Sequence, residues 1–176
     1  MSGSYNVPSE RTEIIRGREN VIDAALIFIS NAKRIDACVD FTRPALAIDI
    51  ASIRKSLAEP KKGVRLRVLT EITAENLSDC KQLTTLVELR HTDGIKGSFY
   101  ISDREYLAPA ISHEEGKVAS QMIYSNVREL VEHQQYVFDT LWNKSIQSEK
   151  KIKAIEDGIQ PDVTEIIRDT NQFFKR

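Results

Sequence analysis

The sequence of 176 residues lacks most of the features that mark a specialised protein. Its two cysteines, Cys38 and Cys80, belong to no CxxC motif or zinc-like cluster. They therefore predict free buried thiols in a reducing cytoplasm, with a redox pair as the alternative. The three histidines are far apart and show no metal-ligand spacing, so we expect neither a metal nor a cofactor. No apolar run approaches the roughly 18 residues of a membrane helix.

Charge of one sign is also lacking, because 25 Lys and Arg residues face 26 Asp and Glu residues, a net charge of -1. This balance argues against electrostatic binding of nucleic acid or of an anionic membrane over a broad surface. The amino terminus, Met1 to Ser4, has no cationic-then-apolar signal pattern. We therefore expect a cytoplasmic protein of one domain, with neither a membrane nor nucleic acid as its partner.

Apolar residues spaced three and four apart predict helices, and short β-rich runs between them predict strands. Helix and strand alternate in the first half, which predicts parallel neighbours, whereas three short strands in near succession later favour antiparallel pairing. The fold class is therefore α/β, a mixed β-sheet flanked by helices with a long C-terminal helix, whose Phe138 and Trp142 belong to the core. The predicted helices are 18–32, 45–57, 74–86 and 127–146, and the predicted strands are 35–40, 64–69, 87–90, 98–102, 105–108 and 118–124.

We predict a flexible tail at residues 1–11, a domain at 12–146 and a helical extension or linker at 147–176. In the extension, Ile152, Ile155 and Ile159 are spaced three and four apart among charged residues. This spacing is typical of a narrow seam, as in a coiled coil or a helix that leaves the body of a domain.

The stretch from Arg90 to Leu107 contains a lysine, Lys96, between two glycines, Gly94 and Gly97, and then a predicted hairpin. Glycine permits backbone angles and close approaches that other residues resist. A lysine held in such a loop can meet an anion, which is either a ligand or a carboxylate of the protein itself.

Ligands of α/β proteins bind beyond the carboxyl ends of the parallel strands. That rule selects Asp40, Thr42 and Arg43 after the first strand, Thr70, Glu71 and Thr73 after the second, and Arg90 and His91 after the third. One hypothesis is a polar pocket in which Arg43, Arg90 and Lys96 face an anionic group. The alternative is a buried salt-bridge network that pairs Arg43 or Arg90 with Asp40 or Glu71. We expect His91 to be structural, with a role as catalytic base as the alternative.

Three local patterns together resemble a phospholipase D-like half-domain: Lys96 before a strand that ends at Asp103, then Ser125-Asn126, then the long helix. Active members of that family carry H-x-K-x4-D and a later Ser/Asn pair. Their histidine is the nucleophile, the lysine and the pair hold the phosphate, and two half-sites meet across an interface. Lys96 matches the lysine, but Gly94 stands in place of the histidine, and the acid is displaced from position 101 to Asp103. Without the nucleophilic histidine, no side chain at this position can accept the phosphoryl group. We therefore expect that the protein is not an enzyme.

More narrowly, residues 12–161 resemble the amino-terminal sensor regions of archaeal membrane-free histidine kinases, through runs such as 36–44, 69–73, 94–97 and 134–144. The resemblance implies a sensory domain that detects a small anionic ligand or a partner, forms a homodimer and works with downstream kinase or PAS modules. The alternatives are a phosphodiesterase or nuclease of the phospholipase D superfamily and an effector domain of a transcriptional regulator. The candidate ligand-binding residues are Asp40, Thr42, Arg43, Thr70, Glu71, Arg90, His91, Lys96, Ser125 and Asn126.

Overall fold

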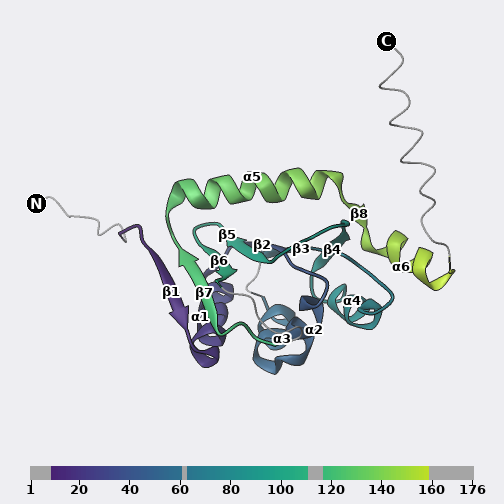
Figure 1. Cartoon of the computed structure of the whole chain (residues 1–176), viewed down its shortest axis with the longest axis horizontal. Coiled ribbons are helices and arrows are strands. Elements are labelled where there is room, and N and C mark those ends of the chain that lie inside the picture. Colours follow the sequence, from purple (N-terminus) through teal and green to yellow (C-terminus); the bar gives the residue numbers. More distant parts are fainter. Residues whose placement is uncertain (1–8, 61–62, 111–116, 159–176) are drawn as a thin grey trace, which may run out of the picture.

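A mixed sheet of eight strands organises the chain in the computed structural model, which describes residues 9–60, 63–110 and 117–158 (Figure 1). The strand order is β1-β7-β6-β5-β2-β3-β4-β8, with β2, β3 and β4 parallel to one another and the other neighbours antiparallel. The strands are β1 (Thr12–Arg16), β2 (Arg34–Cys38), β3 (Arg65–Thr70), β4 (Glu88–His91), β5 (Phe99–Ser102), β6 (Tyr106–Pro109), β7 (Gln121–Ser125) and β8 (Ile146–Gln147). The helices are α1 (Arg18–Asn31), α2 (Arg43–Asp49), α3 (Ala51–Ala58), α4 (Leu77–Leu83), α5 (Arg128–Lys144) and α6 (Ser148–Glu156).

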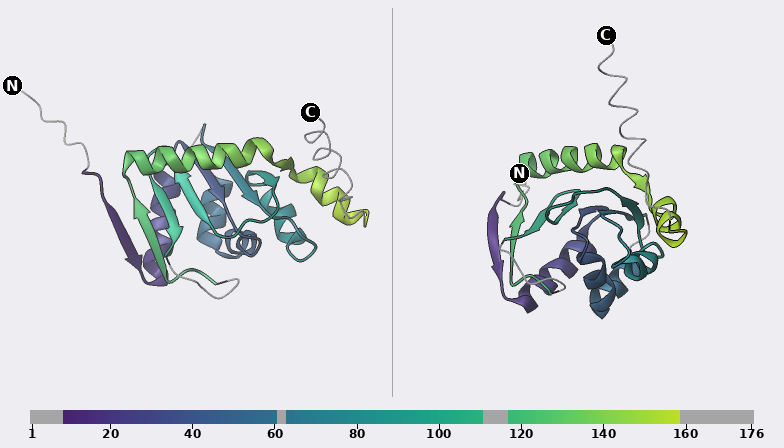
Figure 2. Two further views of the ribbon diagram at one scale, coloured as in Figure 1. Left: turned by 45° about the horizontal axis from the view of Figure 1, so that its top comes forward. Right: turned by 45° about the vertical axis from the view of Figure 1, so that its right-hand side comes forward.

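The helices form two layers around the sheet. Helices α1 to α4 cover one face, and α5 crosses the other face (Figure 2). The predicted fold class, a mixed α/β sheet flanked by helices with a long helix near the C-terminus, is confirmed.

Strand alternation divides the core into two clusters, because successive side chains of a strand point to opposite faces. In β3, Leu66 and Val68 pack in the cluster beneath α1 to α4, whereas Leu69 packs in the cluster beneath α5. Phe138 and Trp142 of α5 are buried in this second cluster, as predicted, and their rings stack with centroids 5.5 Å apart.

Several observed elements, β8 among them, differ from the prediction. Strand β1 was missed, because it is defined by its pairing with β7 on the far side of the sequence and not by a local pattern. The helix predicted at 45–57 is broken at Ile50, which has extended backbone angles (φ -79°, ψ 100°). The helix predicted at 74–86 spans only Leu77–Leu83, since the Asn76 side chain bonds the Thr73 amide and the Phe41 and Glu71 carbonyls and holds a turn before it.

Two isoleucines of the C-terminal extension pack against the domain itself. Strand β8 pairs with β4, and Ile152 and Ile155 of α6 pack against the cluster beneath α1 to α4. Lys81 of α4 also pairs with Glu156 of α6. The short spacing of these isoleucines therefore reflects a helix docked on its own domain, while Ile159 lies outside the described residues.

Both cysteines are free and buried, as predicted. Burial raises the pKa of each thiol to about 12, so both stay protonated at neutral pH. Within the described ranges, no helix is long and apolar enough to cross a bilayer.

Candidate functional site

The loops that follow β2, β3 and β4 gather several predicted residues at one edge of the sheet. Asp40 is the centre of this group: its Oδ1 accepts hydrogen bonds from the amide and hydroxyl of Thr42 (3.1 and 2.6 Å), and its Oδ2 accepts one from the Ser98 hydroxyl (2.9 Å). Burial raises the pKa of Asp40, but these hydrogen bonds and the Arg43 charge outweigh it, so the net pKa is lowered. The Thr70 hydroxyl reaches the Asp40 carbonyl at 3.5 Å. The ionised Asp40 thus connects the end of β2 to the loop before β5 through hydrogen bonds.

That loop, residues 92–98, carries Lys96 on the surface. The Gly94 amide donates to Glu71 Oε2 at 3.1 Å, and Gly94 has a φ of 74°. A residue with a Cβ, histidine included, is strained at this angle. The loop, with Leu141 of α5, lines a pocket of about 340 Å³ in which Lys96 and Asp93 supply the charges. This pocket is the candidate ligand site at the carboxyl edge of the parallel strands.

His91 is buried and bonded on both ring nitrogens. Its Nδ1 accepts the Ile72 amide proton at 2.9 Å, which places the proton of the neutral ring on Nε2, 3.0 Å from Asp93 Oδ1. Burial and the charge of Lys151 lower the pKa of His91, and Asp93 opposes this shift only in part. The histidine therefore ties β4 to the turn after β3, which is a structural role.

We expect His91 to make the folded state sensitive to mild acid. Its folded pKa lies below the ordinary value of about 6.5, so the unfolded chain takes up a proton first and the free energy of unfolding falls as pH drops below 6.5. The loss is at most about 1.4 kcal/mol per pH unit. Urea unfolding at about pH 7.5 and about pH 5.5 should show a smaller loss for His91→Gln than for the wild type. His133→Gln, which changes an exposed histidine of α5, should keep the wild-type loss; an equal loss in both variants would contradict the assignment.

The three predicted cations do not meet in one pocket. Arg90 precedes His91 on β4 and so points to the opposite face, where its guanidinium lies 4.5 Å from the Trp142 ring centroid and 3.6 Å from Glu88. Arg43 is buried in α2 beside Asp40, as the salt-bridge alternative proposed. Only Lys96 lines the loop pocket.

Ser125 and Asn126 also lie away from that pocket. Three successive antiparallel pairings separate β7 from β2, so the carboxyl end of β7 lies at the opposite edge of the sheet from that of β2. There the Ser125 hydroxyl contacts that of Thr12 at 2.8 Å, and Asn126 Oδ1 accepts the Arg11 amide proton at 2.6 Å. This pair therefore fastens the N-terminal strand, and residues 9–11 of the predicted tail are hydrogen-bonded to it.

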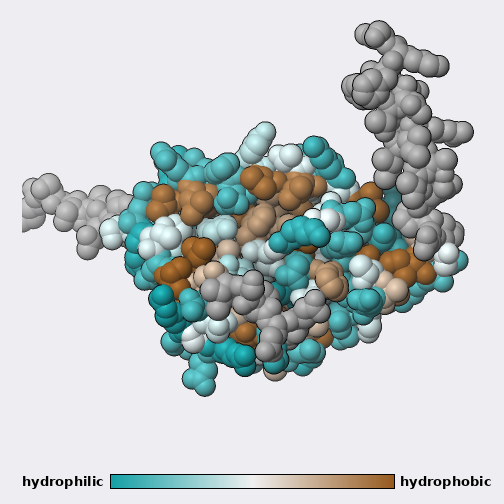
Figure 3. All heavy atoms as spheres, viewed as in Figure 1, coloured by the Kyte–Doolittle hydropathy of each residue, from teal (hydrophilic) through white to brown (hydrophobic). Residues whose placement is uncertain are grey.

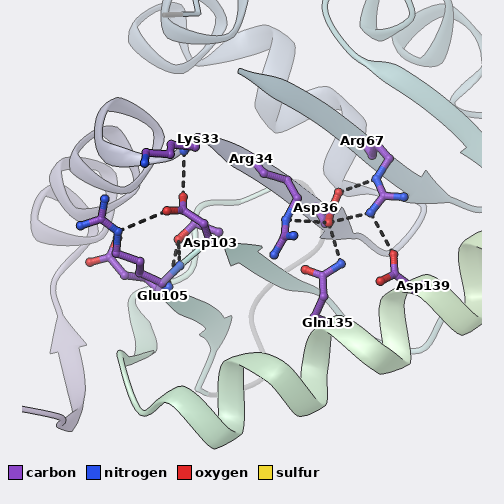
Figure 4. Close-up of polar contacts among 10 residues, drawn as sticks. Lys33, Arg34, Asp36, Arg67, Asp103, Glu105, Gln135 and Asp139 are labelled. Carbon is purple, nitrogen blue, oxygen red and sulfur yellow. Dashed lines mark hydrogen bonds and ion pairs between the residues drawn. The ribbon is translucent and has the colours of Figure 1, made fainter. Parts of the chain in front are cut away.

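Asp103, the displaced acid of the family signature, is likewise remote from Lys96. Strand β5 runs from Phe99, opposite Cys38, to Ser102, opposite Ile35, which puts Asp103 beyond the far end of the strand. Its Oδ1 accepts the Lys33 amide proton at 2.8 Å (Figure 4).

Sequence reasoning missed a charged network beneath α5 (Figure 4). Asp36 is fully buried and receives Nε and Nη2 of Arg67 at 2.7 and 2.8 Å and Nε2 of Gln135 at 2.8 Å. Arg67 also reaches Asp139 at 2.9 Å, and its guanidinium lies 4.9 Å from the centroids of the Phe138 and Trp142 rings. The available signal was an acid and a base, each in the middle of a predicted strand.

No protein-family model matches the sequence, and no curated protein matches it in sequence. Solved structures do resemble it. TrmBL2, an archaeal chromatin protein described as showing a novel mode of DNA binding, aligns over 81% of this chain with a TM-score of 0.57 and 18% identity; the match spans 56% of TrmBL2, about half of its length.

Two smaller proteins align over nearly their whole length. NucT from Helicobacter pylori matches with a TM-score of 0.62 and 9% identity, over 79% of this chain and 99% of its own. Nuc from Salmonella typhimurium, a phospholipase D family member, matches with a TM-score of 0.61 and 17% identity, over 79% and 98%. At these identities the likeness concerns the fold, and the chain has a phospholipase D-like α/β fold.

Proposed function

We propose that this domain is a non-catalytic ligand-binding module of a cytoplasmic signal-transduction protein of the histidine-kinase type. The observation that carries the proposal is the loop pocket: Lys96 is exposed there, while the position two residues before it is a glycine with a positive φ. The pocket keeps a cation suited to an anionic ligand group and lacks the nucleophile of the phospholipase D signature. The buried His91, with both nitrogens engaged, is no substitute.

The position of the pocket suggests how binding is passed on. Leu141 of α5 lines it, and α5 continues through β8 into α6 near the end of the described chain. A ligand that contacts the loop and Leu141 favours one placement of α5 and α6 over another, which is how binding shifts a population. Downstream kinase or PAS modules would receive that shift.

We also propose that the module works as a homodimer. Apolar residues gather along α5 on the face shown in Figure 3. Tyr136 of α5 is 71% exposed and Ile146 of β8 is 46% exposed. Large apolar side chains grouped on a surface are typical of protein interfaces.

A ligand for the loop pocket should raise the melting temperature through Lys96. In a thermal-shift screen of anionic metabolites and inorganic phosphate, a ligand at 100 times its dissociation constant adds about 2.7 kcal/mol. Lys96→Ala should remove that shift and leave the melting temperature of the free protein unchanged, because Lys96 is exposed. Lys150→Ala, which removes an exposed cation of α6, should keep the shift; loss of the shift in both variants would indicate nonspecific charge.

The alternative function, a phosphodiesterase or nuclease, is tested by incubating the protein with a generic phosphodiester such as bis(p-nitrophenyl) phosphate. We expect no release of p-nitrophenol above buffer. Turnover that disappears in His91→Gln would replace the present proposal with a phosphodiesterase or nuclease.

A transcriptional-regulator effector domain is the second candidate, and the structural likeness to TrmBL2 is the observation that favours it. TrmBL2 extends well beyond the matched region, and the sequence of this chain, with 25 Lys and Arg residues and 26 Asp and Glu residues, is balanced in charge. Such a role would require a DNA-binding segment joined to this domain, and the ligand test above applies to it unchanged.

A further inference from the structure

A second cavity lies between the sheet and helices α1, α2 and α3, on the face opposite α5. Its volume is about 160 Å³, and its walls are apolar side chains of the three helices and of the strands facing them. Helix α3 has no buried residue, and its Ile53 and Leu57 line this cavity. The apolar stripe of α3 therefore faces space that the described residues do not fill.

Of the two arginines that border the apolar space, Arg67 is paired with Asp36 and Arg43 is the less well paired. Arg43 is only 6% exposed and lines the cavity. Its Nη1 donates to the Lys117 carbonyl at 3.2 Å, and its Nε lies 3.4 Å from Asp40 Oδ2. Its Nη2 is buried and has no hydrogen-bond partner among the described residues.

Asp40 compensates this charge only weakly. A charge-assisted N–H···O bond is typically about 2.7–2.9 Å long, shorter than the contact of Arg43 with Asp40. The carboxylate of Asp40 already accepts hydrogen bonds from Thr42 and Ser98, which orient it toward the loop. A buried guanidinium with an unsatisfied N–H is costly, and an incoming anion would relieve that cost.

A second donor lies close by. Tyr100 of β5 lines the same cavity, and its hydroxyl is a hydrogen-bond donor. Burial raises the pKa of this phenol, and the Arg43 charge opposes the shift. The phenol therefore keeps its proton at neutral pH and can donate it to an anion beside Arg43.

We propose that this cavity binds a monocarboxylate with an apolar tail, whose carboxylate accepts hydrogen bonds from Arg43 Nη2 and the Tyr100 hydroxyl. The tail has roughly six to eight carbon atoms, since an apolar cavity of about 150 Å³ accommodates a benzene-sized molecule. This site is separate from the loop pocket of Lys96, which lies at the edge of the sheet and on the α5 side. The inference therefore stands whether or not the proposed function holds.

The test is calorimetric titration of the protein with sodium octanoate below its micellar concentration, and with 1-octanol for comparison. We expect saturable binding of one octanoate per chain, with 1-octanol about tenfold weaker or worse because it lacks the anion. Arg43→Met keeps the length of the side chain without its charge, and Ala47→Phe fills the cavity from α2. Each should weaken octanoate at least tenfold, whereas Arg54→Met, at an exposed arginine of α3, and Lys96→Ala should leave it unchanged.

Three results would overturn the proposal: no octanoate binding, equal affinity for octanoate and 1-octanol, or binding that survives Ala47→Phe. Circular dichroism shows whether Arg43→Met folds; if it does not, Ala47→Phe and the octanol comparison decide the question. Loss of octanoate binding in Lys96→Ala would place the ligand in the loop pocket and also refute the proposal. Failure of the phosphate and metabolite screen, by contrast, bears on the loop pocket alone.

Discussion

Replacing Asp36 with alanine is expected to lower the free energy of unfolding by about 3–5 kcal/mol, the cost of removing one partner of a buried ion pair. The charge left behind is that of Arg67, which donates two hydrogen bonds to Asp36 and is itself buried. Asp139 remains as a partner of Arg67, but its side chain is 47% exposed, and an arginine keeps its proton in proteins, so the buried guanidinium stays charged. Because small domains have stabilities of about 5–15 kcal/mol, urea unfolding should show a large fall in the midpoint.

Asp139→Ala is the matched control. It removes the other carboxylate bound to Arg67, but this side chain is 47% exposed and its loss leaves the Asp36 pair intact. Exposed ion pairs contribute about 0–1 kcal/mol, so the midpoint should move little. If Asp36→Ala and Asp139→Ala lower the urea midpoint equally, the Asp36–Arg67 pair contributes no more to stability than an exposed ion pair.

Replacing both partners tests whether the network contributes net stability. Apolar residues of similar volume often substitute for a buried ion pair without loss, because the desolvation cost of both charges disappears. We expect Asp36→Leu combined with Arg67→Met to be far less harmful than Asp36→Ala alone. A double variant as unstable as the single one would show that α5 needs the hydrogen bonds themselves, including that of Gln135.

The fold was largely predictable because periodicity reports which face of an element is buried. The stripe of Val131, Phe138 and Trp142 predicted the long helix, and the alternation in β3 predicted a strand with at least one buried face. Both are observed. Strand β1 was not predictable in this way, since its partner β7 lies more than 100 residues away. The break at Ile50 has no proline or glycine beside it that could have marked it in the sequence.

The candidate site was predicted in part. The strand-end rule brought Asp40, Thr42, Thr70 and Glu71 to one edge, where the hydrogen bonds of Asp40 and Glu71 are found. It could not state which face Arg90 takes or that β7 runs against β2, since both depend on register and strand order. The Asp36–Arg67 pair was missed because composition cannot distinguish a buried arginine from an exposed one.

Phe138→Ala should destabilise the domain by about 3–5 kcal/mol through a cavity beneath α5. Phe138 is fully buried, stacks on Trp142 and supports the guanidinium of Arg67. Ile27→Ala of α1 is the control, because it removes an apolar side chain that is 58% exposed and should change the free energy of unfolding by less than about 0.5 kcal/mol. Urea unfolding monitored by far-ultraviolet circular dichroism measures both.

The same pair of variants examines the route proposed for the signal. Leu141, three residues after Phe138, lines the loop pocket, so α5 must sit firmly on the sheet for a ligand there to move it as one body. Hydrogen exchange should then show faster exchange of α5 and the 92–98 loop in Phe138→Ala, and wild-type protection in Ile27→Ala. If the loop keeps its protection while α5 loses it, the pocket and the helix are not coupled, and α5 cannot carry a ligand signal toward α6.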